Sequence, residues 1–105
     1  MRIVSKGGSA PAVIECGQLT VGISRQARNR LLVELRGELD IASAGELERK
    51  LYLPRRAKVD LDLSGLTFVD AAGMRVLLGI LGKRGGRARV VATSSAVARR
   101  MSETT

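Results

Sequence analysis

The sequence predicts a single α/β domain built on a mixed β-sheet of four to five strands, with helices packed mainly on one face. Residues 19–23 alternate with the period of a strand, and the largely apolar residues 31–35 predict a second strand. The rest of the chain alternates between helical and strand patterns. The 105 residues contain no internal repeat and no internal linker, and this length suits one domain. Together these observations predict one sheet in one domain.

The composition predicts an aliphatic core and a cytoplasmic location. Hydrophobic residues make up 45% of the chain, but only Tyr52 and Phe68 are aromatic, so Val, Leu, Ile and Ala must fill the interior. Cys16 is the single cysteine and the N-terminus has no apolar signal region, which fits a reducing compartment. No apolar run reaches the roughly 20 residues that span a bilayer, so we expect no membrane insertion.

The formal charge of +8 raises nucleic acid or an anionic membrane as partners. The basic residues are scattered in small clusters, however, and the acidic residues lie mostly between Glu34 and Asp70. No aromatic set is present that could stack on bases. We therefore interpret the charge first as solvated surface, second as a surface for an acidic protein partner, and we expect no direct nucleic-acid contact.

The first part of the chain predicts two antiparallel strands. Residues 1–17 are rich in Gly, Ser, Ala and Pro and predict a loose arm or an edge strand, whereas residues 18–105 form the domain. The apolar alternation over 19–23 and the largely apolar residues 31–35 predict two strands that pair across a turn at Asn29.

The first helix is predicted from a capping pattern. Ser43 and Glu46 form an S-x-x-E motif, in which each side chain caps the other's backbone, so a helix is expected to start at about Ala44. Leu47 lies on its apolar face, and the helix must stop before Pro54, which cannot donate an intrahelical hydrogen bond.

The next strand is predicted over residues 58–63. Its apolar residues alternate with Asp60 and Asp62, which point to the opposite face, and the Ser64-Gly65 pair is expected to break it. Two carboxylates without a histidine are a poor ligand set, so no metal site is expected.

A second helix is predicted to run from Ala71 to about Arg84. Asp70 is placed to cap it, and Gly85 with the glycine after it is a C-terminal stop. The spacing i, i+3, i+4, i+7 predicts a buried stripe of Met74, Leu77, Leu78 and Leu81.

The last elements follow from the same logic. Residues 89–92, Arg-Val-Val-Ala, are reached through a crossover helix, so they predict a strand parallel to the one before that helix. Ser94 or Ser95 is placed to cap a short final helix, from Ala96 to about Met101.

With these elements in order, the chain resembles the STAS domain, the family of bacterial anti-sigma factor antagonists and of sulfate-transporter cytoplasmic tails. The resemblance covers roughly residues 19–101. The segments that carry it are Leu35-Arg36-Gly37-Glu38-Leu39-Asp40, Leu61-Asp62-Leu63-Ser64-Gly65-Leu66-Thr67-Phe68-Val69-Asp70, Ala71-Ala72-Gly73-Met74 and Arg87-Ala88-Arg89-Val90-Val91. The fold that this resemblance implies is a STAS-like domain.

The resemblance also implies what happens at the start of the second helix. In the resembled antagonists this junction has the sequence Asp-Ser-Ser-Gly or Asp-Ser-Thr-Gly, and a partner kinase phosphorylates the second hydroxyl residue. Here the junction is Asp70-Ala71-Ala72-Gly73. Ala72 takes the phosphoacceptor position and has no hydroxyl, so the family's regulatory phosphorylation is not expected at this site.

The function implied by the resemblance is that of a protein-binding regulator, which sequesters an anti-sigma factor and so frees a sigma factor. Its expected partners are that anti-sigma factor and an ATP-binding serine kinase, with no cofactor and no metal. The expected partner-binding residues are Asp40, Ser43, Asp70, Ala71, Ala72, Gly73 and Arg75. The alternative is an accessory STAS subunit of a membrane transport or lipid-trafficking complex.

Several of these residues also have a purely structural interpretation. Asp70 and Ser43 are suited to capping helices, Gly73 to close helix–sheet packing, and Asp40 to ending a strand. An enzyme is not expected, because the chain has no histidine and no nucleophile paired with a base.

Overall fold

The computed structural model describes residues 12–103, which form one five-stranded sheet and three α-helices. This confirms the predicted fold class. In chain order the elements are β1 (Ala12–Cys16), β2 (Leu19–Ala27), β3 (Arg30–Leu39), α1 (Ile41–Lys50), β4 (Lys58–Val69), α2 (Ala71–Arg84), the short 3₁₀ turn η1 (Gly85–Arg87), β5 (Ala88–Ala92) and α3 (Ser95–Glu103).

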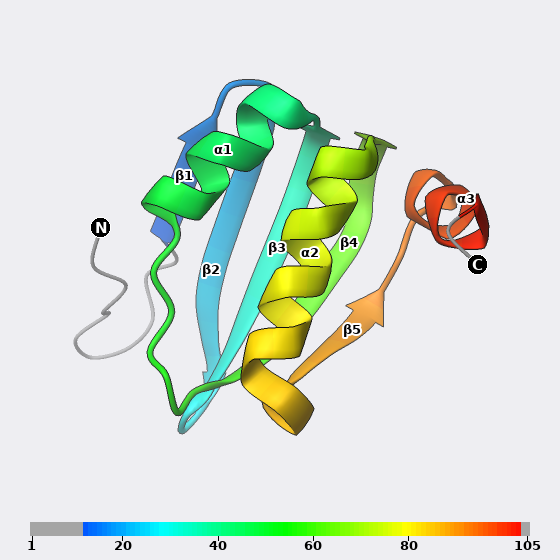
Figure 1. The fold of residues 1–105 in the computed structure, drawn as a ribbon. Helices are drawn as coiled ribbons and strands as arrows, with labels where there is room; N and C mark the ends of the chain where they lie inside the picture. The colour runs from blue at the N-terminus through cyan, green and yellow to red at the C-terminus, as the bar shows by residue number, and fades with distance from the viewer. Residues whose placement is uncertain (1–11, 104–105) are drawn as a thin grey trace.

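The strands lie in sequence order across the sheet. β1, β2 and β3 pair antiparallel, and β3, β4 and β5 pair parallel, so the sheet is mixed as predicted. α1 and α2 run across the same face of this sheet (Figure 1). The parallel connection through α1 brings the ends of β3 and β4 to one edge, where both helices begin.

The segment before Gly17, for which the sequence left an arm or an edge strand open, forms edge strand β1 over residues 12–16. Residues 1–11 lie outside the described part of the chain. Cys16 is fully buried in this strand, and burial raises the pKa of its thiol. It belongs to the core rather than to a loose arm.

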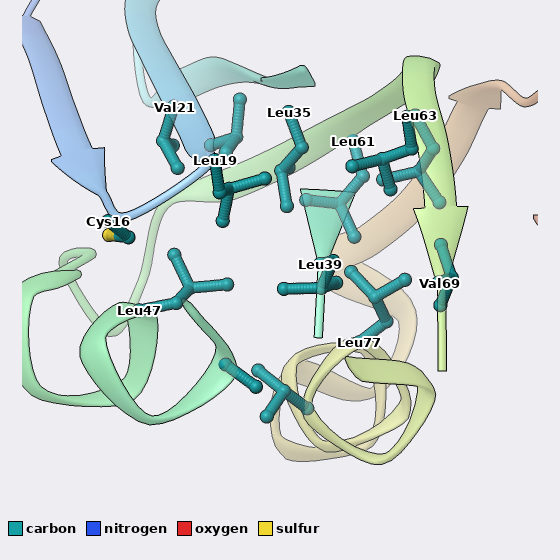
Figure 2. Close-up of a cluster of buried hydrophobic side chains, with 14 of the residues drawn as sticks. Cys16, Leu19, Val21, Leu35, Leu39, Leu47, Leu61, Leu63, Val69 and Leu77 are labelled. Carbon is teal, nitrogen blue, oxygen red and sulfur yellow. The ribbon is translucent and has the colours of Figure 1, made fainter. Parts of the chain in front are cut away.

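The core lies between the sheet and the two helices. Apolar side chains from the strands, such as Leu35, Leu61 and Val69, point toward Leu47 of α1 and Leu77 of α2 (Figure 2). These side chains are at most 4% exposed. The interior is therefore aliphatic, as the composition predicts.

The predicted break at Ser64-Gly65 is wrong, because β4 continues to Val69. The pairing with β3 instead shifts its register at this point, which is a β-bulge. A Cβ on Gly65 would collide with the side chain of Arg36, so glycine allows the two strands to stay together. The bulge keeps both Leu63 and Leu66 on the buried face although they are three residues apart.

The bounds of α2 agree with the prediction, but its buried stripe differs in part. Met74 and Leu77 are buried, whereas Leu78 is 50% exposed and Val76 is buried instead. α2 packs against α1 as well as against the sheet, and this second contact moves the buried arc toward Val76. Leu78 is therefore left on the outer face of α2.

Asp60 points away from the helices, as the alternation predicts, yet it is only 8% exposed. Its Oδ1 accepts from Arg30 Nη1 at 2.8 Å and from Arg89 Nε at 2.9 Å. On the face of the sheet opposite α1 and α2, these two ion pairs therefore link β4 to its neighbours β3 and β5.

The predicted final strand and helix are confirmed. β5 pairs with β4 only as far as Asp62. The second half of β4 therefore has β3 on one side and no strand on the other. α3 lies along this part of β4, where Val97 is buried and Arg100 Nε donates to the carbonyl of Val69 at 3.3 Å. Ser94 caps the helix by accepting from the N–H of Val97.

Candidate functional site

Two strand-to-helix junctions meet at one edge of the sheet. Asp40 joins β3 to α1, and Asp70 joins β4 to α2. The ends of the two strands are paired in register, Leu39 with Val69, so the two aspartates follow neighbouring residues. Both helices begin at the upper edge of the sheet in Figure 1.

Asp40, not Ser43, is the N-cap of α1, and the predicted helix start at Ala44 is wrong. Asp40 Oδ1 accepts from the N–H of Ser43 at 3.0 Å, and the Ser43 hydroxyl accepts from the N–H of Asp40 at 2.9 Å. The capping box is therefore Asp40 with Ser43, and α1 starts three residues earlier, at Ile41. Glu46 takes no part in it and pairs with Lys50 instead.

These hydrogen bonds favour the ionised form of Asp40. The Ser43 N–H first, and then the Ser43 hydroxyl, hold the pKa of the Asp40 carboxyl below its usual value. The hydroxyl of Ser43 also donates to the carbonyl of Glu38 at 2.9 Å. Ser43 thus ties the end of β3 to the first turn of α1.

Asp70 caps α2 as predicted, and it also reaches α1. Its Oδ1 accepts from the N–H of Gly73 at 2.8 Å, and its Oδ2 accepts from the N–H of Ile41 at 3.0 Å. The backbone N–H of Asp70 donates to the carbonyl of Leu39 at 3.2 Å. One carboxylate therefore satisfies free N–H groups at the starts of both helices.

Gly73 allows the close approach of α2 to the end of β3. A Cβ at this position would collide with the carbonyl oxygen and the side chain of Leu39. Gly73 is buried, so its contribution to the site is to place the first turn of α2 rather than to touch a partner.

The structure brings the seven predicted site residues together but gives them different roles. Ser43 is 2% exposed and, like Gly73, holds the helix starts from inside. Ala71 and Arg75 are exposed, and Ala72 is partly exposed, so they form the outer surface of the first turns of α2.

Sequence reasoning missed two exposed apolar residues beside this turn. Ile41, the first residue of α1, is 74% exposed, and Leu78 lies on the same face of α2 as Ala71 and Arg75. The signal for Ile41 was present in the sequence, because a residue directly after the cap lies off the face that carries Leu47.

We call Ile41, Ala71, Ala72, Arg75 and Leu78 the helix-start surface. It contains small and apolar side chains and a single charge. Within residues 12–103 there is no group of three or more Cys, Asp or Glu residues that could hold a metal ion. The arrangement offers a preformed apolar contact area, which suits binding to another protein.

The chain belongs to the STAS domain family, which confirms the resemblance. A family model described as "Mlab, STAS domain" matches residues 24–104, a range that includes both junctions. No curated protein sequence matches the chain. No helix in the described part of the chain is long and apolar enough to cross a membrane.

Solved structures show the same fold. The chain is similar to an anti-sigma factor antagonist from Mycobacterium paratuberculosis, with 25% identity and a TM-score of 0.66 over 82% of this chain and 77% of that one. It is similar to the anti-sigma factor antagonist SpoIIAA in its unphosphorylated form, with 18% identity, a TM-score of 0.59 and coverage of 81% and 83%. It is also similar to the STAS domain of an antisigma-factor antagonist from Rhodobacter sphaeroides, with 18% identity and a TM-score of 0.62 over 87% of this chain and 96% of that one.

Proposed function

We propose that this protein is a cytoplasmic regulator that binds an anti-sigma factor through the helix-start surface and so frees a sigma factor. The support is the STAS fold, the likeness to an anti-sigma factor antagonist at 25% identity, and the exposed first turn of α2. The function is binding rather than catalysis.

The observation that carries the proposal is Ala72 in the first turn of α2. Asp70 and Gly73 keep the geometry of a capped helix start that packs on β3, while the two residues between them have only methyl side chains. In the resembled antagonists a hydroxyl at this position accepts phosphate. Here the surface keeps its shape and has no acceptor, so binding at this site is not switched off by phosphorylation.

The physical effect of a phosphate would fall on the partner rather than on the fold. A helix N-terminus favours an anion, because its free N–H groups and its dipole attract negative charge. A phosphate would nevertheless add roughly −1.5 to −2 charges, which must lose water in an interface. An alanine at position 72 avoids this cost permanently.

Binding should depend mainly on the apolar members of the surface. Ile41 and Leu78 are large side chains that already face solvent, so covering them removes apolar area from water. Arg75 lies between the small residues and Leu78 along α2 and adds charge that suits an acidic partner.

The test is capture of partners from the source cytoplasm, with mass spectrometry to identify them. Wild type should retain an ATP-binding anti-sigma factor, and Ala72→Asp should lose it, because a carboxylate would be buried in the interface. Ala72→Asn, which has the same shape without the charge, is the matched control and should retain more of the partner. Equal capture by wild type and Ala72→Asp would contradict the proposed site.

The fold of the Asp variant can be checked independently. A carboxylate in the first turn complements the helix dipole, so thermal unfolding should show no loss of stability. A lower melting temperature would instead attribute the lost binding to misfolding.

The absence of the phosphorylation switch needs a separate experiment. The captured kinase and ATP should add no phosphate to the wild type, as judged by intact mass, whereas Ala72→Ser should become an acceptor. A phosphate on Ser64, Thr67 or another residue of the wild type would contradict this part of the proposal.

A second candidate is an accessory STAS subunit of a membrane transport or lipid-trafficking complex. The support for it is the description of the matching family model, "Mlab, STAS domain", which does not mention sigma-factor regulation. The same capture experiment separates the two, since a transport ATPase in place of an anti-sigma factor would favour this candidate.

A further inference from the structure

A hollow of about 460 Å³ lies at the other end of α2, away from the helix-start surface. Its walls are the C-terminal half of α1, the segment that leads from α1 to β4, and the second half of α2 with η1. In Figure 1 this connecting segment descends from the end of α1 and then turns toward the lower end of α2. Its volume falls within the range of small-molecule sites, about 300–1,000 Å³.

The lining of this hollow has two chemical parts. Six apolar or aromatic side chains contribute to it, among them Leu51, Tyr52 and Ile80. Four basic side chains and one acidic side chain complete it, and the basic ones are Arg55, Lys83, Arg84 and Arg87. A second hollow, lined by Arg55, Arg56 and Arg87, shares two of these residues with it and extends the basic side.

Most of these cations lack a counter-charge within the described residues. No ion pair there joins Arg55, Lys83 or Arg87 to a carboxylate. Arg84 donates to the carbonyls of Leu53, Pro54 and Ala57, each at 2.9 Å, so its charge is fixed in the wall. Burial, and then repulsion from Arg87, lower the pKa of Arg84.

We propose that this basic hollow binds an amphipathic organic phosphate, a small molecule with an apolar body and a phosphate or diphosphate end. The apolar body lies on Leu51 and Ile80, and the phosphate end pairs with Arg87 and its basic neighbours. A bound anion supplies the counter-charge that these side chains lack. The phosphate end of the site, at Arg87, lies just past the end of a 14-residue helix, about 20 Å along the helix axis from the first turn, so this end is separate from the helix-start surface.

Tyr52 makes binding directly measurable. It is the single tyrosine of a chain without tryptophan, it is 57% exposed, and it lines the hollow. Titration with geranyl diphosphate should change its fluorescence and saturate. Inorganic pyrophosphate, which lacks the apolar body, and geraniol, which lacks the charge, should each bind at least about tenfold more weakly. Equal binding of pyrophosphate and geranyl diphosphate would overturn the amphipathic assignment.

Two glycines of α2 provide a matched pair of variants. Gly79 lines the hollow and Gly82 does not, and nothing lies within 4 Å of a Cβ built on either. Because the Cβ at position 79 is unobstructed, Gly79→Leu should extend into the hollow and weaken geranyl diphosphate at least about tenfold, while Gly82→Leu should bind like the wild type. Unchanged affinity in Gly79→Leu, or equal loss in both variants, would overturn the proposed location.

A second pair of variants tests whether binding requires the basic side chains of the hollow. Arg87→Glu should weaken binding at least about tenfold, whereas Arg99→Glu, an equal change of net charge on exposed α3, should leave it nearly unchanged. Equal losses in the two variants would show that net charge, rather than this hollow, attracts the anion.

The last experiments distinguish a phosphate held in a membrane lipid from one in a dissolved molecule. Retention on phosphatidylcholine vesicles that contain phosphatidic acid, lost in Gly79→Leu, would support a membrane-held ligand, and binding of free geranyl diphosphate alone would support a dissolved one. Binding of a poly-glutamate peptide but not of geranyl diphosphate would overturn the proposal in favour of an acidic protein segment.

Discussion

The two ends of α2 differ in almost every property except the helix that joins them. At the N-terminal end, a shared carboxylate and a buried glycine hold a surface of small and apolar side chains. At the C-terminal end, Arg84 holds the connecting segment through three carbonyls, and basic side chains surround a hollow. One helix thus carries two different surfaces, one of small and apolar side chains, which we propose for a protein partner, and one that is basic, which we propose for an anion.

Gly73→Ala should give the largest change in stability and would test the first end. The added methyl would collide with backbone and side-chain atoms of Leu39, and α2 cannot move away without losing its packing on the sheet. We expect the free energy of unfolding to fall by about 3 kcal/mol, as for overpacked sites. Urea denaturation measures it, and a change of less than about 0.5 kcal/mol would contradict the close approach.

Arg84→Ala should give the next largest effect and would test the second end. It removes three charge-assisted hydrogen bonds that join α2 to the segment before β4. A loss of about 2 kcal/mol is expected, because each bond is partly replaced by water. Lys83→Ala is the matched control, since Lys83 is exposed on the same turn, and it should cost little. Equal losses in both variants would show that Arg84 acts only through net charge.

Gly79→Ala should act in the opposite direction to Gly73→Ala although both glycines lie in α2. A Cβ at position 79 meets open space, so the substitution should add stability through helix propensity, about 1 kcal/mol. The same urea denaturation measures it. A loss of stability would mean that the wall of the hollow is more crowded than the structure shows.

The smallest expected effect is on the stability of the fold at acidic pH. Donated hydrogen bonds hold the pKa values of Asp40 and Asp62 below the ordinary 3.8, so the unfolded chain takes up protons at these groups more readily than the folded one. Their contribution to the free energy of unfolding is complete above pH 3.8, and it is lost as the pH falls through the lowered pKa values. Asp40→Asn keeps a competent cap, so it should flatten the loss of stability below about pH 4 while changing little at neutral pH.

Unfolding titrations of wild type and Asp40→Asn across this pH range check the point. Parallel curves for the two proteins would show that Asp40 is not held in its ionised form by the Ser43 box.

Local signals in the sequence predicted much of the fold and part of the site. The cap Asp70, the helical period and the glycine stop act within a few residues of one another, and they gave the bounds of α2 correctly. The parallel placement of β5 followed from chain connectivity alone. The helix-start residues were found through the family resemblance.

The differences arose where distant contacts decided the outcome. Ser64 and Gly65 are turn formers, but pairing with β3 kept β4 continuous across them. Two capping boxes were available at the start of α1, and the earlier one, with Asp40, formed where Asp70 also accepts from the N–H of Ile41. The bond from Asp70 to Ile41 spans 29 residues, and the basic hollow combines three separate segments, so neither has a local pattern.

The carboxylate of Asp70 has one more consequence. Because it holds the first turns of both α1 and α2, these turns cannot tilt independently, and Ile41 keeps a fixed position relative to Ala71. A partner that docks here does not have to order the two helix starts, so little conformational entropy is lost on association. In the proposed complex, the rigidity of these two helix starts would therefore add to the affinity although Asp70 itself need not touch the partner.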